Sequence, residues 1–386
     1  MNIVIATDSF KGCLGSVEAG NAIAEGVRRA LPDSSVSVYP ISDGGEGMAA
    51  SLRSVTGSRA VTARAHDPLG RPIECSYTVI DGKTAVIETA AAAGLPLLSD
   101  SERDPMHTTT AGVGELILDA AERGCRSFII GLGGSATNDG GAGMLQALGV
   151  KMTDGNGRKI CPGAAGLKTI RSIDTSSLSP LLDGCSFSAA CDVTNPLCGK
   201  LGCSEVFAPQ KGADTNSVRL MDSWLRGYAE CMRRAEPNAD PDLPGTGAAG
   251  GMGFALNAVL GARLERGIAL IIRTTGLARA IAEADIVVTG EGRLDAQSIM
   301  GKVPIGIADE ARKHGVPVIA IAGAVSHDAA LCNEHGISAF FPALRRPCTT
   351  DEALEPDTAR TNLADTAEQV FNLIRTVSIT NKSTDI

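Results

Sequence analysis

The sequence predicts an α/β protein: a Rossmann-like parallel-sheet domain split by an inserted second α/β domain with antiparallel strands. Hydrophobic residues make up 44% of the chain and charged residues 20%, which is typical of globular proteins. Aromatic residues make up only 3%, so the core must consist mainly of Ala, Val, Ile and Leu; with 45 Gly, this suits helices packed on a parallel sheet. At 386 residues the chain exceeds the usual size of one core, so we expect two lobes with a cleft between them.

The N-terminal segment has a β-α-β pattern. Residues 3–7 form an apolar run, apolar residues then recur at near-helical spacing from Val17 to Leu31, and Pro32 stops this pattern before a second run at 36–41. A similar alternation returns near the C-terminus, in the strand-like 284–289, the helix-like 302–314, and the strand-like 316–322 and 338–341. The patterns at both ends of the chain therefore predict a doubly wound sheet.

The middle of the chain has a different pattern. Short runs separated by turns, at 59–65, 71–79 and 84–88, favour an antiparallel hairpin region. We therefore expect residues 1–64 and 284–377 to form the Rossmann-like domain, residues 65–283 to form the inserted domain, and residues 378–386 to be a frayed tail.

Charge and cysteine content limit the possible partners. With 35 Lys and Arg against 44 Asp and Glu the net charge is −9, and no basic run interrupts the acidic balance, so we expect no nucleic-acid partner. Residues 1–8 contain no basic leader, and no apolar run reaches the roughly 20 residues of a membrane span. The 11 Cys lack metal-type pairing, which indicates reduced thiols. We expect a cytoplasmic protein without a membrane partner; its oligomeric state is not predicted.

A glycine-rich segment at 131–149 follows the strand-like run 127–130 and precedes a helical pattern. Glycines allow consecutive backbone N–H groups to turn toward one ligand, and a helix N-terminus adds partial positive charge. Ser135, Thr137 and Asn138 add side-chain donors. The segment therefore indicates an anion site, such as a phosphate site, although a tight loop needed only for packing is the alternative.

The same segment also matches a dinucleotide-binding pattern. Gly131, Gly133 and Ala136 satisfy G-x-G-x-x-A, and Asp154 lies near the expected distance for a ribose-binding acid. A second match beginning at Gly245 follows a Pro-rich stretch rather than a strand, which shows how readily the pattern arises in a glycine-rich chain. A nicotinamide-dependent hydroxy-acid oxidoreductase therefore stays open as an alternative.

Charged residues follow the first two predicted strands. Asp8, Ser9 and Lys11 come just after the first, and Asp43 and Glu46 just after the second. Open α/β sheets bind ligands at these strand ends. A carboxylate pair there is suited to Mg²⁺, and Lys11 to a carboxylate or phosphate; helix-capping acids and a solvated lysine are the alternative.

Similar polar groups follow two later runs. Glu291, Asp295 and Gln297 come after the strand-like 284–289, with Lys302 just beyond. In the inserted region the candidates are Asp192 and Asn195, which follow the run 185–191, and Gln210 and Lys211. An Asp after a buried strand is a reasonable general base for a hydroxyl, and a Lys can stabilise transferring phosphoryl charge; turn roles are the alternative.

Seven blocks in chain order resemble the motif series of the type I glycerate kinases: DSFKG at 8–12, SDGGEG at 42–47, GLGGSATNDGGAG at 131–143, DVTNPL at 192–197, FAPQKGA at 207–213, GAAGGMG at 247–253 and TGEGRLDAQS at 289–298. The resemblance spans almost the whole chain. It implies transfer of the ATP γ-phosphoryl group to D-glycerate with Mg²⁺, most often giving 2-phosphoglycerate.

With this resemblance, each candidate residue receives an expected role. The catalytic residues are Asp192, as the base, with Lys11 and Lys211; the nucleotide-binding residues are Gly133, Gly134, Ser135, Asn138, Gly250 and Gly251; the substrate-binding residues are Asp8, Ser9, Asn195, Gln210 and Gln297; the metal ligands come from Asp43, Glu46, Glu291 and Asp295. We expect glycerate between the lobes. A kinase that forms 3-phosphoglycerate and a non-catalytic two-lobe binding protein are the remaining alternatives.

Overall fold

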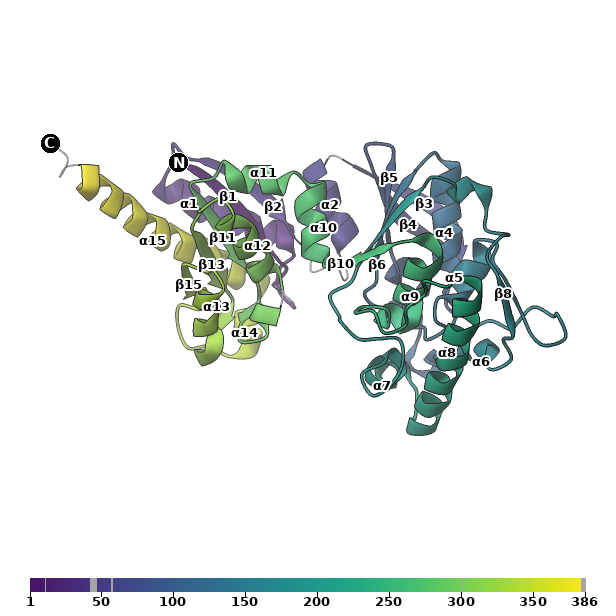
Figure 1. Ribbon diagram of the computed structural model, residues 1–386. Coiled ribbons are helices and arrows are strands. Elements are labelled where there is room, and N and C mark those ends of the chain that lie inside the picture. The colour runs from purple at the N-terminus through teal and green to yellow at the C-terminus, as the bar shows by residue number, and fades with distance from the viewer. Residues whose placement is uncertain (11, 42–46, 57, 301, 383–386) are drawn as a thin grey trace. The chain divides into compact units, whose positions relative to one another are not determined.

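The computed structural model describes residues 1–10, 12–41, 47–56, 58–300 and 302–382 (Figure 1). The chain divides into two compact units, which are described separately. Unit 1 comprises Met1–Asp43, Ser54–Thr56 and Ile268–Ile386, and unit 2 comprises Gly44–Arg53 and Gly57–Gly267. Among the described residues no helix is long and apolar enough to cross a membrane.

Unit 1 is built on a parallel sheet. Its strands are β1 (Asn2–Thr7), β2 (Ser35–Pro40), β11 (Ile286–Gly290), β13 (Val318–Ala322) and β15 (Ala339–Pro342), in the order β15-β13-β11-β1-β2. In the register, Ile5 lies opposite Val288 on one side and Val38 on the other. The strands β1, β11 and β13 are almost wholly buried, as their apolar sequences require.

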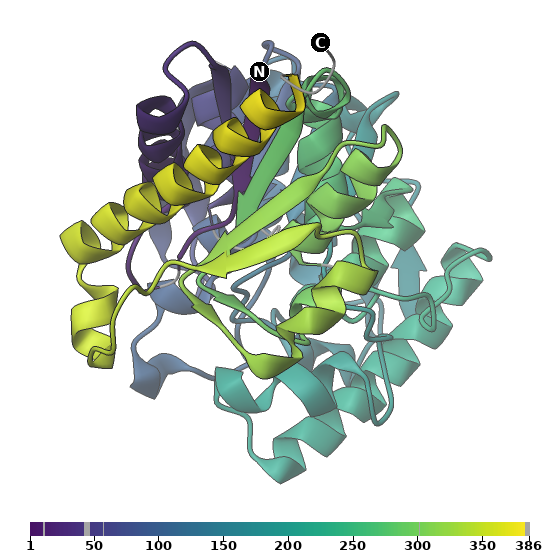
Figure 2. The same cartoon turned by 90° about the vertical axis from the view of Figure 1, so that its left-hand side faces the viewer.

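Helices cover this sheet. They are α1 (Ser16–Ala30), α10 (Gly267–Thr274), α11 (Leu277–Ala282), α12 (Val303–Arg312), α13 (Leu331–Glu334), α14 (Thr350–Leu354) and α15 (Pro356–Lys382), with α2 (Met48–Thr56) shared between the units and the two-residue strands β12 (Arg293–Leu294) and β14 (Ala324–Val325) beside the sheet. Helix α15 crosses in front of the sheet in Figure 2 and packs on α1. A Cβ on Gly26 would lie 1.9 Å from the Ala364 carbonyl oxygen, so this close helix contact requires glycine.

Unit 2 has a mixed sheet. Its strands are β3 (Arg59–His66), β4 (Pro72–Ile80), β5 (Thr84–Glu88), β6 (Ser127–Gly131), β9 (Ser186–Ala190) and β10 (Arg263–Glu265), in the order β10-β9-β6-β5-β4-β3. Neighbours from β10 to β5 are parallel, and β4 pairs antiparallel with both β5 and β3. A small antiparallel pair joins β7 (Lys151–Thr153) and β8 (Ser172–Asp174). The predicted α/β class, with antiparallel strands in the second unit, is confirmed.

The helices of unit 2 enclose its core. They are α3 (Ala90–Ala93), α4 (Ala111–Glu122), α5 (Ala142–Ala147), α6 (Ala164–Leu167), α7 (Cys203–Phe207), α8 (Thr215–Ala235) and α9 (Ala248–Leu260). Phe128 stacks on Phe187 at 4.7 Å, and Tyr228 meets Phe254 edge to face at 5.8 Å. The chain's one tryptophan, Trp224 on α8, packs partly buried against this core.

The units differ in three places from the expected domain limits of 1–64 plus 284–377 and 65–283, the first being that Gly44–Arg53 belongs to unit 2. Strand β3 belongs with unit 2 because all of Arg59–His66 pairs with β4. Residues 268–283 belong to unit 1, where the side chain of Ile268 meets Gly306 of α12. At the C-terminus, α15 continues to Lys382, into the segment expected to fray from residue 378.

Candidate active site

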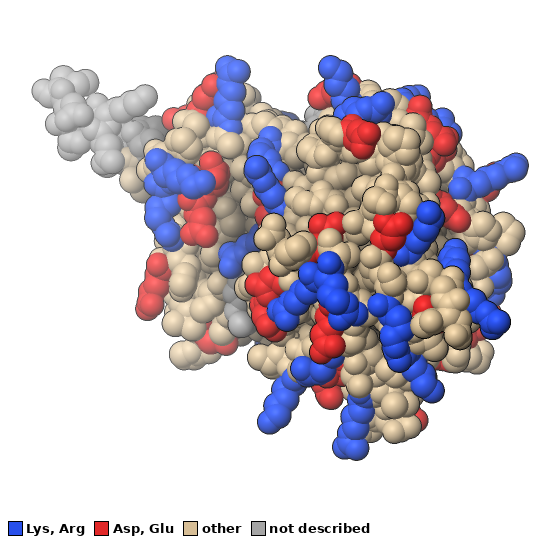
Figure 3. Space-filling model, turned by 45° about the vertical axis from the view of Figure 1, so that its right-hand side comes forward, with Lys and Arg blue, Asp and Glu red and all other residues tan. Residues whose placement is uncertain are grey.

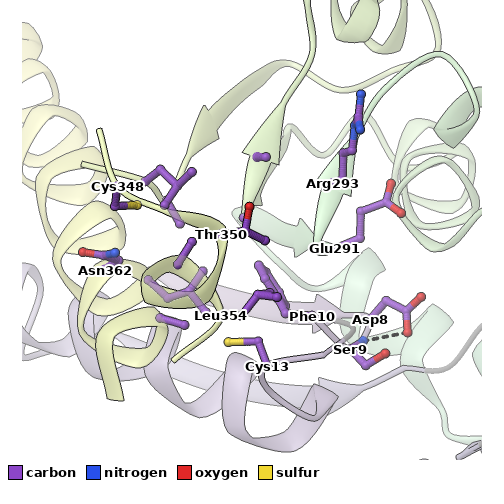
Figure 4. A pocket seen from close by; sticks show the side chains of 18 of the residues that line it. Asp8, Ser9, Phe10, Cys13, Glu291, Arg293, Cys348, Thr350, Leu354 and Asn362 are labelled. Carbon is purple, nitrogen blue, oxygen red and sulfur yellow. Dashed lines mark hydrogen bonds between the residues drawn. The ribbon is translucent and has the colours of Figure 1, made fainter. Parts of the chain in front are cut away.

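A pocket opens at the carboxyl ends of the unit 1 strands. The strand order is that of a doubly wound sheet with its switch point between β1 and β11, where such sheets bind ligands. Asp8 follows β1 and Glu291 follows β11, and both line the pocket (Figure 4). Its volume is about 620 Å³, and its lining comprises Asp8, Ser9, Phe10, Cys13, Glu291, Gly292, Arg293, Asp295, Lys302, Gly323, Ala324, Ala343, Leu344, Cys348, Thr349, Thr350, Ala353, Leu354, Ala359, Asn362 and Leu363.

Acidic groups and cations gather at one end of this pocket. Glu291 is buried and accepts a hydrogen bond of 2.5 Å from Ser298 Oγ, and Lys302 Nζ lies 3.7 Å from its other oxygen. Burial raises the pKa of Glu291, and the charge of Asp295 adds to that effect. Arg293 Nε lies 3.4 Å from Asp295 Oδ2. The carboxylates of Glu291 and Asp295 thus lie close enough to interact, and each is paired with a cation.

Asp8 and Ser9 extend this polar end. Asp8 is 7% exposed, and its Oδ1 accepts the Ser9 backbone N–H at 2.6 Å. Gln297 follows in the same loop as Asp295, whose Oδ1 accepts its backbone N–H at 2.9 Å, but its own side chain is exposed outside the pocket lining. The predicted Lys11, Asp43 and Glu46 lie outside the described residues.

In unit 2 a second group forms at the carboxyl edge of the mixed sheet. Strands β6 and β9 are parallel neighbours with Gly131 opposite Ala190, so the segments that follow them start side by side. Gly133 is half-buried and Gly134 is exposed. Asp192, just past β9, is exposed, and its Oδ1 accepts the Gly267 backbone N–H at 3.1 Å. The glycine loop and the predicted base therefore emerge from adjacent strands.

Lys211 lies beneath the glycine loop rather than on the surface. The residue is 2% exposed, and its ammonium donates to Ser135 Oγ at 2.8 Å and to the Thr137 carbonyl at 2.7 Å. Burial lowers the pKa of Lys211 to about 8, against the opposing influence of Cys203 and Asp139. The described residues accept two hydrogen bonds from an ammonium that has three donors.

Asp139 organises the same loop, although the sequence motifs did not single it out. It is fully buried and accepts hydrogen bonds from Thr110 N at 2.9 Å, Thr110 Oγ1 at 2.9 Å, Gly141 N at 3.0 Å and Gly143 N at 3.1 Å. Burial raises its pKa, and these hydrogen bonds oppose that rise. One carboxylate thereby fixes the turn into α5 and the start of α4.

The other predicted nucleotide-binding residues lie in the interior. Asn138 is fully buried and donates to Ser204 Oγ at 2.8 Å. Gly250 and Gly251 are also buried, and the Gly250 carbonyl accepts the Gly140 N–H at 2.9 Å. A Cβ on Gly250 would lie 2.0 Å from the Thr137 carbonyl oxygen. Gly250 and Gly251 thus allow the start of α9 to pack against the glycine-rich loop. The accessible part of that loop is at Gly133 and Gly134.

Replacing Gly250 with alanine is expected to destabilise unit 2 by roughly 3 kcal/mol, since it adds a backbone clash to a left-handed φ of +65°. Trp224, the only tryptophan, reports the unfolding of unit 2 in urea by fluorescence. The control is Gly261→Ala, with φ +60° and nothing within 4 Å of the added Cβ, which should cost about 1 kcal/mol. Equal losses of unfolding free energy in Gly250→Ala and Gly261→Ala would refute close packing of Gly250 against the glycine loop.

Asn195 and Gln210 complete the predicted set. The Asn195 amide donates to the Leu201 carbonyl at 2.7 Å and shapes the segment before α7. The side chain of Gln210 is exposed beside Lys211. The structure therefore brings Asp8, Ser9, Glu291 and Asp295 together in unit 1, and places the remaining described candidates in unit 2, apart from Gln297.

Known proteins resemble this chain along most of its length. The model of the Glycerate kinase family matches residues 3–375. The glycerate 2-kinase of Escherichia coli K12 is 48% identical over 92% of this chain and 93% of its own length, and the glycerate kinase of Bacillus subtilis 168 is 43% identical over 92% and 93%. A crystal structure provisionally named glycerate kinase 2, from Salmonella typhimurium LT2, has a TM-score of 0.87 and 43% identity, covering 98% of this chain and 99% of that one. The resemblance seen in the motifs is thus confirmed: this chain belongs to the glycerate kinase family.

Proposed function

We propose that this protein transfers the γ-phosphoryl group of ATP to the 2-hydroxyl of D-glycerate, giving 2-phosphoglycerate and ADP. The observation that carries the proposal is the 48% identity, along nearly the full length of both chains, to a relative named glycerate 2-kinase. That name also favours the 2-product over the 3-product. The grouping of acids, cations and glycines at the carboxyl ends of parallel strands supports a phosphoryl-transfer site.

For the chemical step we propose Asp192 as the general base. Its exposed carboxylate accepts the proton of the 2-hydroxyl while that oxygen bonds to the γ-phosphorus. The bond from the γ-phosphorus to the bridging oxygen breaks, and ADP leaves with the electron pair. The hydrogen bond from Gly267 N to Asp192 Oδ1 helps to orient the carboxylate.

Gly133, Gly134 and Ser135 are proposed to receive the phosphoryl group during transfer. Gly133 and Gly134 form the accessible part of the loop, and Lys211 lies directly beneath it through Ser135. A buried cation adjoining such a loop stabilises negative charge strongly because water does not screen it. Asn138, Gly250 and Gly251 are proposed to act indirectly, by holding the loop in shape.

Magnesium is proposed to accompany ATP at the acidic end of the unit 1 pocket. Mg²⁺ in nucleotide sites commonly takes one or two carboxylates and fills its other positions with phosphates and water. Glu291 and Asp295 fit that requirement, since each offers carboxylate oxygens in one loop. The described residues contain no group of three or more His, Cys, Asp or Glu side chains arranged for a metal ion. The ion would neutralise phosphate charge there, and Asp43 and Glu46 are further proposed ligands.

The contacts of the acid substrate are proposed residue by residue. Lys11 would pair with its carboxylate, and Ser9, Asn195, Gln210 and Gln297 would donate hydrogen bonds from their side chains, with Asp8 holding the loop that carries Ser9. These assignments use only polar side chains that follow strands or lie in the matching motifs.

The test is an ADP-formation assay with ATP, Mg²⁺ and either D-glycerate or L-glycerate. ADP formation that depends on D-glycerate supports the proposal. Absorbance change with a nicotinamide cofactor and a hydroxy acid, without ATP consumption, would instead establish the oxidoreductase alternative. Binding of D-glycerate without turnover of either kind would indicate a non-catalytic binding protein.

Replacing Gly134 with valine is expected to raise KM for ATP by about tenfold, which corresponds to roughly 1.4 kcal/mol of binding. The added side chain would cover the accessible part of the loop at Gly134 and hinder approach of a phosphate to its backbone. Gly157→Val is the matched control, because Gly157 has a similar φ of +76° in open space in the turn between β7 and α6. An unchanged KM for ATP in Gly134→Val would remove the loop from phosphate binding.

A cytoplasmic location and a small-molecule partner are also part of the proposal. Each of the 11 cysteines is free, which suits a reducing compartment. On the face shown in Figure 3, basic and acidic side chains are interspersed.

A further inference from the structure

We infer that the purine base of the nucleotide binds in the half of the unit 1 pocket that faces α14 and α15, with Asn362 contacting its edge. The inference rests on the proposed function and goes beyond it, because no motif in the sequence points to the residues of this half. Figure 4 shows the two halves: Asp8, Ser9, Glu291 and Arg293 lie on one side, and Leu354, Cys348 and Asn362 on the other.

The half near α14 and α15 has a largely aliphatic surface, with Thr349 and Thr350 also in its lining. Leu344 and Leu354 are 38% and 40% exposed although both are large aliphatic side chains, and both line the pocket. The buried Phe10, Ala343 and Leu363 line the same pocket. Exposed aliphatic surface over an apolar floor is stabilised when a flat apolar ring covers it. The charged end offers no such surface.

Asn362 gives this half a specific polar contact. It lies on α15, is half-buried and lines the pocket, and its amide has no hydrogen-bond partner among the described residues. A carboxamide presents a donor and an acceptor side by side, which matches the amino group and ring nitrogen on the edge of adenine. A few placed polar groups, such as this amide, fix the orientation of a ligand in a mainly apolar site.

The opposite end suits the phosphates of the same ligand. Lys302 is the N-cap residue of α12, a ten-residue helix, and it lines the pocket together with Arg293. The helix N-terminus adds partial positive charge at the same place. Asp8, Glu291 and Asp295 line the same end, so phosphates would bind there together with the proposed Mg²⁺. A ligand with an apolar ring at one end and metal-bound phosphates at the other therefore matches the pocket along its length.

Size favours a nucleotide over the acid substrate. The cavity of about 620 Å³ falls within the range of sites for drug-sized molecules. A three-carbon hydroxy acid would fill a small part of it and would leave the apolar half empty. The location at the switch point of the sheet is also where doubly wound folds place nucleotides.

Two cysteines in the pocket provide a direct test on the unaltered protein. Cys13 and Cys348 line the pocket and are partly accessible, whereas Cys161 is exposed in unit 2. Maleimide labelling at each cysteine is followed by peptide mass spectrometry, with ADP, with D-glycerate, or with neither. ADP should slow labelling of Cys348 and Cys13 at least about fivefold and leave Cys161 unchanged. D-Glycerate alone should protect neither pocket cysteine.

Two substitutions test the base contact in the assayed enzyme. Leu354→Asp places a carboxylate in the apolar half and should raise KM for ATP about tenfold or more, with KM for D-glycerate nearly unchanged. Leu373→Asp is the matched control, since Leu373 is 62% exposed on α15 outside the pocket lining. Asn362→Leu keeps the side-chain size and should reduce the preference for ATP over GTP by about tenfold. Circular dichroism and the melting temperature show whether each variant is folded.

The outcomes separate this inference from the proposed function. D-Glycerate-dependent ADP formation together with unprotected cysteines and an unchanged KM for ATP in Leu354→Asp would overturn the base site and leave the kinase intact. Protection by D-glycerate but not by ADP would also overturn it, and would make the pocket the acid site. Protection by ADP without any glycerate-dependent turnover would support the nucleotide site while the proposed function fails.

Discussion

Replacing Asp192 with asparagine is expected to lower kcat by about 100-fold or more, with a much smaller effect on KM for ATP. The carboxylate is exposed just past β9 beside the glycine loop, where it can accept the hydroxyl proton of the acid substrate. An amide retains an oxygen that can accept the Gly267 N–H, so the local structure should persist while the base is lost. Steady-state kinetics at varied ATP and D-glycerate measures the effect.

Asp183→Asn is the matched control, because Asp183 is an exposed aspartate of the same unit that precedes β9 rather than following it. Its kcat should equal that of the wild type. A near-normal kcat in Asp192→Asn would exclude Asp192 as the base and would direct attention to carboxylates in unit 1.

Replacing Lys211 with methionine is expected to lower kcat by roughly 100- to 1000-fold, the scale of losing one group that stabilises transition-state charge. Methionine is similar in length and suits a site that is 2% exposed. A buried cation is costly to desolvate, so the urea midpoint reported by Trp224 should change little compared with the loss of activity. A large loss of stability with normal turnover in the remaining folded protein would show that Lys211 is only structural.

The pH dependence of activity provides an independent test of Lys211. Because burial lowers the pKa of Lys211 to about 8, its charge is present below that pH and is lost as the pH rises through it. The kcat of the wild type should therefore fall on the alkaline side with a midpoint near pH 8. In Lys211→Met this alkaline fall should disappear from the residual activity. If kcat of Lys211→Met still falls near pH 8 as in the wild type, that fall belongs to the titration of another group.

The fold was predictable where one pattern dominates locally. The β-α-β opening was read from an apolar run, a helical period and a second run, and these are β1, α1 and β2. The pairing of β3 with β4 depends on residues that meet across a turn, and the assignment of 268–283 depends on contacts such as Ile268 with Gly306. Unit limits are therefore harder to predict than elements, because contacts between distant segments decide them.

The candidate site was predictable only where residues follow strands. Asp8 and Glu291 were found because strand ends are legible in the sequence, and they share one pocket. Glycine patterns do not distinguish a glycine that faces a ligand from one that meets another backbone, and Gly250 is of the second kind. Asp139 lies inside the glycine-rich motif, but its role as a buried acceptor for distant N–H groups is not legible there, and Asn362 had no signal because it faces the pocket from a long helix.

The central claim is that the 2-hydroxyl of D-glycerate accepts the phosphoryl group, and the product of the purified enzyme tests it directly. Proton-coupled ³¹P NMR of the product from ATP, Mg²⁺ and D-glycerate distinguishes the two isomers. A phosphorus on the 2-oxygen couples to the single proton at C2 and should give a doublet. A triplet from the two C3 protons would establish the 3-phosphorylated product and contradict the claim.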